Sequence, residues 1–352
     1  MPEVDLVAVT PYGRQAGSSR VRVYDWLDHF GYLNYSVNSY INTADAGTRT
    51  LITQPAKVLQ AEAALRTLAR RPTNRLLLHR EASPFSRGRL EARLLRNAAL
   101  SVYDFDDALQ WDLPRSIGTR VFPKPVKCLA SVCNADRVVA GNELLADWAS
   151  AYTKDVRIIP SCVDPSRYLR KVNYELRDPP QLMWIGSPAT EKYILPIADA
   201  LRALHERTGA RLTVISRGSQ PLSGLDHMVD RQDWDSRGFA AQLTEADVGI
   251  GSLDNTKYAT GKCAYKVLQY AAVGLPSVVS PVGANLLAAS RFKYAVATTD
   301  VDWLESLEAL LYSSSGTRSA IGAAARGAVE KHYSFDAWSD EWMAAYDLPR
   351  AT

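Results

Sequence analysis

The stretch that most constrains the fold runs from Gly261 to Gly283 and reads GKCAYKVLQYAAVGLPSVVSPVG. A run of good helix formers is followed by Gly274 and Pro276. These two residues end a helix, because glycine accepts the left-handed cap and proline cannot continue the helix. Residues 277–280 are short, β-branched and apolar enough for a buried parallel strand. A loop, a helix, a tight stop, a strand and a second loop in this order predict an α/β domain.

Three polar side chains in this stretch are expected to share one helix face. Lys262, Lys266 and Gln269 are spaced at i, i+4 and i+7. Lys262 is expected at the helix N-terminus, which already favours anions. One interpretation is a site for a phosphate-bearing ligand, with the Gln269 amide bonded to a sugar hydroxyl. The other is a solvated polar face, and the spacing does not separate the two.

Composition excludes several classes of protein. The 352 residues, 47% hydrophobic and 22% charged, fit two globular α/β domains. A formal net charge of +3 is too small to indicate a nucleic-acid partner. No apolar run approaches the roughly 18 residues that span a bilayer, and the N-terminus is expected to be a first strand, not a signal peptide. The four cysteines lack metal-type pairing, so reduced thiols in the cytoplasm are expected.

Polar side chains follow the first expected strand, residues 4–9. Ser18 or Ser19 can cap a helix whose apolar residues lie on one inward stripe. Arg20 and Arg22 fall in the first turn of that helix, where a cation opposes the helix dipole. A ligand contact and a solvated arginine are both open interpretations.

Three carboxylates lie at the end of the strand expected at residues 100–103. They are Asp104, Asp106 and Asp107. Carboxylates at the C-terminal end of a parallel strand lie where open α/β sheets place ligands. They could bind a metal, act as a base or orient a substrate hydroxyl, or they could cap a helix. The basic helix expected before this strand, residues 87–100, could lie on anionic lipid, although its plain interpretation is a solvated face.

The second half of the chain opens with an expected strand at residues 182–185. Gly186 and Ser187 follow it, and Thr190 can cap the next helix. A strand, a loop of small residues and a helix N-terminus form a natural anion site, and Lys192 adds a positive charge nearby.

Several of these segments resemble one known family. The Gly261–Gly283 stretch, YDFDDA at residues 103–108 and WIGSPATEKY at residues 184–193 are similar to motifs of retaining glycosyltransferases of the GT-B fold, in the family-four group. The resemblance covers nearly the whole chain. It implies transfer of a sugar from a nucleotide-diphosphate donor to a hydroxyl-bearing small molecule or glycan, with retention of configuration. It implies no metal and no cofactor beyond the nucleotide sugar itself.

The resemblance also implies a domain organisation. The fold class is α/β, with two doubly wound, Rossmann-like parallel-sheet domains that face a cleft. The first domain is expected at residues 1–170 on the acceptor side, and the second at residues 171–334 on the donor side. A last helix, residues 335–352, is expected to cross back to the first domain.

Site residues carry over from the matching motifs, and they fall into three groups. The expected catalytic residues are Asp106, Asp107, Lys192 and Lys266. The expected donor-binding residues are Gly186, Ser187, Thr190, Arg217, Lys262, Tyr265, Gln269, Gly283 and Asn285. The expected acceptor-side residues are Ser18, Ser19, Arg20 and Arg80.

The chain departs from the family pattern at the donor site. Most members have a pair of glutamates where this chain has Gly261 and Gln269, and an arginine where it has Ser187. Two alternatives follow from the missing groups. The chain could couple an atypical, non-sugar partner to an activated donor, or it could be a non-catalytic subunit that binds a nucleotide sugar.

Overall fold

The computed structural model describes residues 4–41, 48–113, 117–218, 220–235 and 238–348. The chain divides into two compact units. Unit 1 comprises Met1–Ser161, Gly261–Cys263 and Trp338–Thr352, and unit 2 comprises Cys162–Thr260 and Ala264–Ala337. The sequence placed the first boundary at residue 170. In the structure Val163 donates its backbone N–H to the Tyr333 carbonyl, at 2.9 Å, and so belongs with unit 2.

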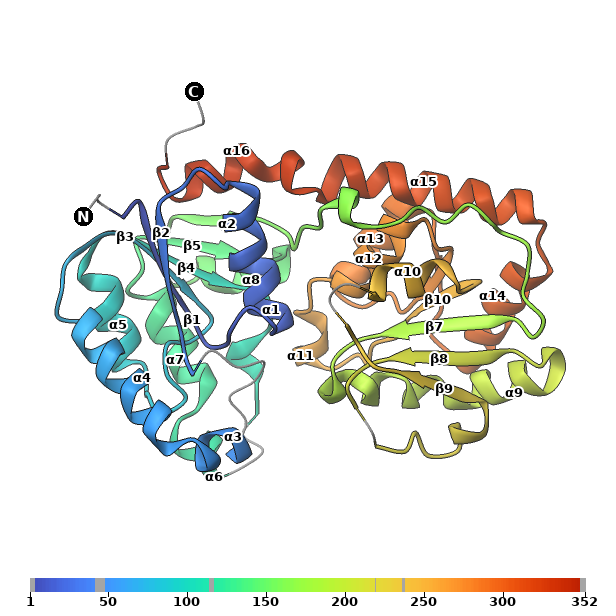
Figure 1. The fold of residues 1–352 in the computed structure, drawn as a ribbon, viewed down its shortest axis with the longest axis horizontal. Helices are drawn as coiled ribbons and strands as arrows, with labels where there is room; N and C mark the ends of the chain where they lie inside the picture. Colours follow the sequence, from blue (N-terminus) through green and yellow to red (C-terminus); the bar gives the residue numbers. More distant parts are fainter. Residues whose placement is uncertain (1–3, 42–47, 114–116, 219, 236–237, 349–352) are drawn as a thin grey trace. The chain divides into compact units, whose positions relative to one another are not determined.

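Unit 1 is built on a six-stranded sheet whose neighbouring strands are all parallel, in the order β2-β1-β3-β4-β5-β6. Helices α4, α5 and α7 lie on one side of it, and α2 lies on the other (Figure 1). Its strands are β1 (Leu6–Thr10), β2 (Tyr35–Ser39), β3 (Thr73–His79), β4 (Ala98–Phe105), β5 (Arg137–Ala140) and β6 (Val156–Ile158). Its helices are α1 (Gly17–Ser19), the π-helix η1 (Arg20–Tyr24), α2 (Asp25–His29), α3 (Thr48–Thr53), α4 (Pro55–Leu68), α5 (Arg89–Arg96), the 3-10 helix η2 (Leu109–Trp111), α6 (Ile117–Val121), α7 (Lys124–Val132) and α8 (Glu143–Ser150).

Unit 2 has a second parallel sheet, in the order β12-β11-β10-β7-β8-β9. Its strands are β7 (Gln181–Ile185), β8 (Arg211–Ile215), β9 (Val229–Gln232), β10 (Val248–Gly251), β11 (Ser277–Val279) and β12 (Ala295–Val296). Its α-helices are α9 (Ala198–Thr208), α10 (Phe239–Thr244), α11 (Lys257–Thr260), α12 (Tyr265–Val273), α13 (Ala284–Phe292), α14 (Asp300–Tyr312) and α15 (Ser315–Tyr333), and α16 (Phe335–Ala345) begins in unit 2 and ends in unit 1. Its 3-10 helices are η3 (Pro165–Arg167), η4 (Pro188–Tyr193), η5 (Leu195–Ile197) and η6 (Asp226–Met228).

Strand β7 shows why the sheet of unit 2 is covered on both faces. Met183 and Ile185 pack in a core with helices α10, α12, α13 and α15. Leu182 and Trp184 pack in a second core with α9 and α14. Successive side chains of a strand point to opposite faces, so a strand buried on both faces is apolar throughout. The predicted α/β class with two doubly wound sheets is confirmed.

The last helix contributes apolar side chains to unit 1. Trp342 is 1% exposed, and its ring stacks on that of Trp26 with centroids 5.4 Å apart. Trp26 belongs to the predicted inward stripe of the first helical segment, whose members Val23, Leu27 and Phe30 are also buried. In the part of the chain that the structure describes, no helix is long and apolar enough to cross a membrane.

Candidate functional site

The carboxylates after β4 are bound by cations. The guanidinium of Arg80 donates from Nε to Asp106 Oδ1 at 2.7 Å and from Nη2 to Asp107 Oδ2 at 2.6 Å. Arg80 follows β3 in the left-handed region, at φ 61°, and its backbone N–H donates to the Asp104 carbonyl. The ends of β3 and β4 therefore lie side by side. Arg80, predicted on the acceptor side, binds both Asp106 and Asp107, which were predicted to be catalytic.

Beneath this cluster lies a fully buried ion pair. Arg22 donates from Nη2 to Asp104 Oδ2 at 2.5 Å and from Nη1 to the Ile159 carbonyl at 2.7 Å. His79 Nδ1 lies 2.7 Å from Asp104 Oδ1. Both interpretations of Arg22, as a ligand contact and as a solvated side chain, are wrong, because the side chain is 1% exposed and its guanidinium is bound to Asp104 and to the Ile159 carbonyl. No sequence pattern marked this ion pair, apart from the three neighbouring aspartates Asp104, Asp106 and Asp107.

Electrostatics keep the buried carboxylates ionised. Burial opposes ionisation of Asp106, but the charges of Arg80 and His79 outweigh it and hold the pKa of Asp106 below its ordinary value. Burial likewise opposes ionisation of Asp104, and Arg22 and His79 hold the pKa of Asp104 below its ordinary value. An ionised carboxylate accepts hydrogen bonds, so Asp106 is suited to orient a hydroxyl group.

A second cation reaches Asp107 from a distant part of the sequence. Lys262 Nζ lies 3.2 Å from Asp107 Oδ1. Its segment, Gly261–Cys263, belongs to unit 1 although the chain on both sides belongs to unit 2. Asn142 donates to the Gly261 carbonyl at 2.9 Å, and the Cys263 thiol donates to the Asp106 carbonyl at 3.2 Å.

This placement corrects one prediction. Lys262, Lys266 and Gln269 do not share a helix face, because α12 begins only at Tyr265 and Ala264 before it is left-handed, at φ 56°. Gln269 is 4% exposed, and its amide lies 3.4 Å from the Tyr168 hydroxyl. The helix is buried from Val267 to Val273, so its burial follows packing on every side rather than one amphipathic stripe.

The other acceptor-side residues lie after β1. Ser19 is fully buried, and its hydroxyl has no hydrogen-bond partner among the described residues. Ser18 is half-buried, and Arg20 Nη1 lies 4.0 Å from Asp25 Oδ2. Strands β1 and β3 flank the point where the strand order of unit 1 reverses, which is where doubly wound sheets bind ligands.

In unit 2 the strand order reverses between β7 and β10. The loop after β7 holds Gly186, Ser187 and Thr190. The prediction that Thr190 caps the next helix is wrong, because Ser187 is the N-cap of the 3-10 helix η4 and Thr190 is its third residue. The Thr190 hydroxyl accepts the Ser187 backbone N–H at 3.1 Å. Lys192 is exposed, with Nζ 4.9 Å from the centre of the Tyr193 ring.

Lys266 lies in the first turn of α12, beside this loop's strand. Its Nζ is 4.2 Å from the centre of the Trp184 ring, on β7. The neighbouring Tyr265 is half-buried against the core. A cation above an indole face at a helix N-terminus concentrates positive charge at the switch point of the sheet.

The remaining predicted donor residues follow other strands of unit 2. Arg217, after β8, is exposed over the Trp234 ring, 5.2 Å from its centre. Gly283 precedes α13 at φ 54°. Asn285 is buried, and its amide donates to the Gly251 carbonyl at 3.0 Å, so this side chain holds the end of β10.

One buried acid near the loop after β7 was missed by sequence reasoning. Glu191 is 4% exposed, and Arg231 Nη1 and Nη2 both lie 3.1 Å from its Oε2. A side chain at Gly218 would place its Cβ 1.9 Å from Glu191 Oε1. The pair links η4 to β9, and Arg231 also donates to the Gly218 carbonyl in the loop after β8, at 3.0 Å. Only a distant arginine and a glycine marked this arrangement in the sequence.

Comparisons with known proteins show the fold. No protein-family model matches the chain, and no curated protein matches it in sequence. Solved structures do resemble it. HepE of Anabaena, solved with UDP and glucose, has a TM-score of 0.69 at 11% identity and covers 98% of this chain and 100% of its own. The α,α-trehalose 6-phosphate synthase of Burkholderia multivorans has a TM-score of 0.63 at 12% identity, over 98% of this chain and 96% of its own.

A third likeness covers only part of a longer protein. A mutant of S. aureus TarM, solved with Fondaparinux, α-GlcNAc-glycerol and UDP, has a TM-score of 0.58 at 11% identity over 78% of this chain. The chain spans about half the length of TarM, with 55% of that protein covered. With both parallel sheets matched over nearly the whole chain in the first two structures, the fold class is GT-B.

Proposed function

We propose that this protein is a glycosyltransferase that takes a sugar from a nucleotide-diphosphate donor and transfers it to a hydroxyl-bearing acceptor with retention of configuration. The observation that carries the proposal is Lys266 at the start of α12, beside the loop after β7 and at the switch point of the second sheet. HepE and TarM, whose fold is shared, were solved with UDP.

In this proposal unit 2 holds the donor. The bond between the anomeric carbon and the diphosphate oxygen breaks, and negative charge develops on the leaving diphosphate. Lys266, Lys192 and the backbone N–H of Ala189 stabilise that charge, which is the main demand of the reaction. The acceptor oxygen forms its bond to the anomeric carbon on the face that the diphosphate leaves, and the acceptor proton passes to the departing diphosphate.

Unit 1 holds the acceptor. Asp106 is ionised and held by Arg80. It can therefore accept a hydrogen bond from the hydroxyl group of the sugar acceptor and orient that group without taking its proton. Replacing Asp106 with Asn should impair transfer and leave nucleotide binding intact. If nucleotide affinity is lost as well, Asp106 serves the donor site or the fold instead.

Thermal denaturation with UDP, GDP, ADP and dTDP tests the donor assignment. A nucleotide present at 100 times its Kd should stabilise the folded protein by about 2.7 kcal/mol. Slow release of nucleotide from the matching nucleotide sugar without acceptor would then show an active enzyme. Absence of any shift with all four nucleotides would refute the proposal.

One observation favours a second function. Gly261 occupies the place of a family glutamate, and a Cβ there would lie 2.4 Å from the Ala108 Cβ. The usual carboxylate to the donor sugar therefore does not fit at this position. Coupling of a non-sugar partner is the alternative, and product analysis by mass spectrometry separates it from sugar transfer.

A further inference from the structure

His79 lies at the end of β3, and one of its ring nitrogens is buried without a partner. The side chain is 0% exposed, and Nδ1 lies 2.7 Å from Asp104 Oδ1. The other nitrogen, Nε2, has no hydrogen-bond partner among the described residues. It lies 4.0 Å from Asp106 Oδ1, which is too long for a hydrogen bond but within the range of an ion pair. Buried polar atoms are almost always bonded, so this nitrogen needs an explanation.

The sheet register places the ring between two carboxylates. His79 and Asp104 are direct neighbours on β3 and β4. Asp106 follows Asp104 by two residues, so both side chains point the same way where the strand ends. Arg22 binds both oxygens of Asp104, from Nε to Oδ1 at 3.2 Å and from Nη2 to Oδ2 at 2.5 Å. Asp104 is therefore fixed, and it keeps Nε2 of the ring turned toward Asp106.

Both neighbours of the ring accept hydrogen bonds and donate none. A neutral imidazole has one N–H and one lone pair, whereas the imidazolium has two N–H groups. With Nδ1 on Asp104, a neutral ring would turn its lone pair toward the Asp106 oxygen, and the two would repel. Burial opposes ionisation of the two carboxylates, but the charges of Arg22 and Arg80, and then of His79, hold their pKa values below the ordinary value. The surroundings of the ring therefore favour the imidazolium.

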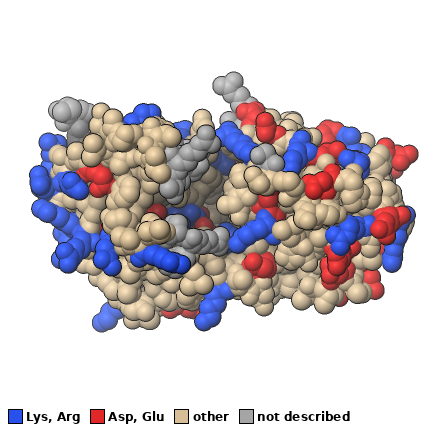
Figure 2. Space-filling view, turned by 90° about the horizontal axis from the view of Figure 1, so that it is seen from below, with Lys and Arg blue, Asp and Glu red and all other residues tan. Residues whose placement is uncertain are grey.

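The rest of unit 1 opposes a further positive charge. Lysine and arginine side chains gather on the left-hand part of the face in Figure 2, which is unit 1. Burial raises the pKa values of the nearby Cys263 thiol and Tyr346 hydroxyl, so both are neutral near pH 7. An imidazolium therefore depends on the two carboxylates beside it. Without it, the charges of the cluster balance one for one, with Arg22, Arg80 and Lys262 against Asp104, Asp106 and Asp107.

We propose that His79 is a positioning residue that, as an imidazolium, bridges Asp104 and Asp106 and determines which oxygen of Asp106 meets the acceptor. Arg80 Nε donates to Asp106 Oδ1 at 2.7 Å, and His79 Nε2 faces the same oxygen. The other oxygen, Oδ2, makes no hydrogen bond to a described residue and is left for the acceptor hydroxyl. The inference rests on the proposed function, to which it adds a residue that is itself buried away from the ligand.

Nuclear magnetic resonance of the full chain, labelled with ¹⁵N-histidine, tests the bridge without any substrate. The chain has five histidines, and His79→Gln identifies the signals of His79 by their loss. Both ring nitrogens of His79 should carry a proton at pH 7. Asp106→Asn keeps the shape of the side chain and removes its charge, so His79 should lose that proton at a pH lower by about one unit or more.

Two substitutions of His79 separate its two nitrogens. An asparagine places its amide near Nδ1, so His79→Asn keeps the bond to Asp104 and loses the group that faces Asp106. A glutamine places its amide near Nε2, so His79→Gln does the reverse. Thermal denaturation should show the larger loss of stability in His79→Gln.

Release of nucleotide from a nucleotide sugar, with water as the acceptor, measures the effect on the reaction. UDP-glucose, with which HepE was solved, is the first probe. His79→Asn should release UDP about tenfold more slowly with an unchanged Kd for UDP, the effect of one lost hydrogen bond to a charged group. The wild-type rate should fall as the pH is raised and the ring loses its proton. The rate of His79→Gln should not fall in this way, because an amide N–H is permanent.

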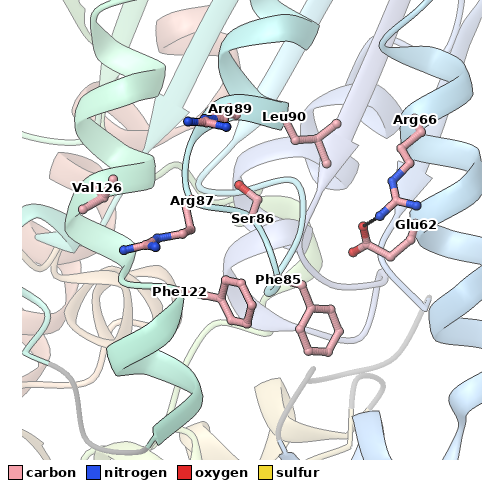
Figure 3. Close-up of a pocket in the computed structure, with 9 residues that line it drawn as sticks. All are labelled: Glu62, Arg66, Phe85, Ser86, Arg87, Arg89, Leu90, Phe122 and Val126. Carbon is pink, nitrogen blue, oxygen red and sulfur yellow. Dashed lines mark ion pairs between the residues drawn. The ribbon is translucent and has the colours of Figure 1, made fainter.

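Arg66→Gln is the matched control for the loss of a charge. Arg66 Nη2 lies 3.9 Å from Glu62 Oε2, nearly the separation between His79 and Asp106. This pair lies at a cavity of about 570 Å³, whose lining Figure 3 shows and which neither His79 nor Asp106 lines. The control should leave the His79 signals unchanged and alter the rate by about twofold or less. Circular dichroism checks that every variant is folded.

Two results would overturn the proposal. One is a wild-type ring with a single proton at pH 7 that titrates as it does in Asp106→Asn. The other is equal release of UDP by His79→Asn and an active wild type, which would leave His79 a packing role only. Absence of release by the wild type would instead count against the proposed function, and the resonance experiment would still decide whether the bridge exists.

Discussion

At the scale of single residues, unit 1 depends on compensated buried charge. Arg22 and Asp104 are each 1% exposed and bind one another through two hydrogen bonds. Removal of one partner of a buried ion pair leaves the other charge uncompensated, which costs about 3–5 kcal/mol. Arg22 therefore holds the buried Asp104 carboxylate ionised, and it does so only while both members of the pair are present.

Asp104→Asn should lower the free energy of unfolding by about 3–5 kcal/mol, measured by urea denaturation. The matched control is Asp230→Asn, which breaks the half-exposed pair with Arg211 and should cost at most about 1 kcal/mol. Equal losses in the two variants would contradict the buried role of Asp104.

The same carboxylates predict a dependence of stability on pH. The pKa values of Asp104 and Asp106 in the folded protein lie below the ordinary value, which is about 3.9 in the unfolded chain. Their stabilisation is therefore fully present above about pH 4 and is lost as the pH falls through the folded values. Urea denaturation from pH 7 to pH 3 should show this loss, and the loss should be smaller in Asp104→Asn.

Lys266 is the residue on which the donor assignment depends. Lys266→Ala should lower the rate of transfer by about 100-fold or more, by analogy with loss of one preorganised donor to developing negative charge. Lys331→Ala removes the same charge from an exposed position on α15 and should leave the rate unchanged. Normal turnover by Lys266→Ala would refute the assignment of this lysine.

At the scale of elements, the strand ends determine where the loops go. Gly283 precedes α13 at φ 54°, and a Cβ there would lie 2.1 Å from the Thr260 carbonyl oxygen. Gly283→Ala should therefore destabilise the protein by at least about 1–3 kcal/mol. Gly327→Ala on α15 meets open space and should stabilise it by about 0.5–1 kcal/mol. Thermal denaturation of both variants measures the difference, and shifts in the same direction would contradict it.

The elements also show what the sequence could predict. Short apolar runs predicted most strands, because strands buried on both faces need little else, and the inward stripe beginning at Val23 predicted the first helical segment. Strand β9, with its polar residues Asp230, Arg231 and Gln232, had no such signal. The prediction that Lys262 and Gln269 share a helix face was wrong for a physical reason. Helical spacing applies only within a helix, and the left-handed Ala264 separates Lys262 from the helix that holds Gln269.

For the candidate site, the sequence predicted which residues take part better than it predicted which side chains they contact. Asp106 and Asp107 stood out as paired carboxylates, but their cations, Arg80 and Lys262, come from segments distant in the sequence. Such contacts depend on how the chain folds back, and no local pattern encodes them.

At the scale of the whole molecule, the last helix completes unit 1. Trp342→Ala removes a fully buried ring that stacks on Trp26, and it should lower the free energy of unfolding by about 3–5 kcal/mol. Limited proteolysis should cleave unit 1 of this variant faster than that of the wild type. Tyr312→Ala, at a 72% exposed position of unit 2, is the control and should change neither. Unchanged stability of Trp342→Ala would contradict the role of the helix.

Unit 1 is assembled from three separate stretches of chain, Met1–Ser161, Gly261–Cys263 and Trp338–Thr352. During synthesis the nascent N-terminal stretch leaves the ribosome long before the other two. The apolar surface around Trp26 therefore stays uncovered until Trp342 has emerged, and the cations of the Asp107 cluster are incomplete until Lys262 has emerged. A premature stop at any codon from Phe335 to Trp342 should thus yield an aggregation-prone chain rather than a shortened but working one.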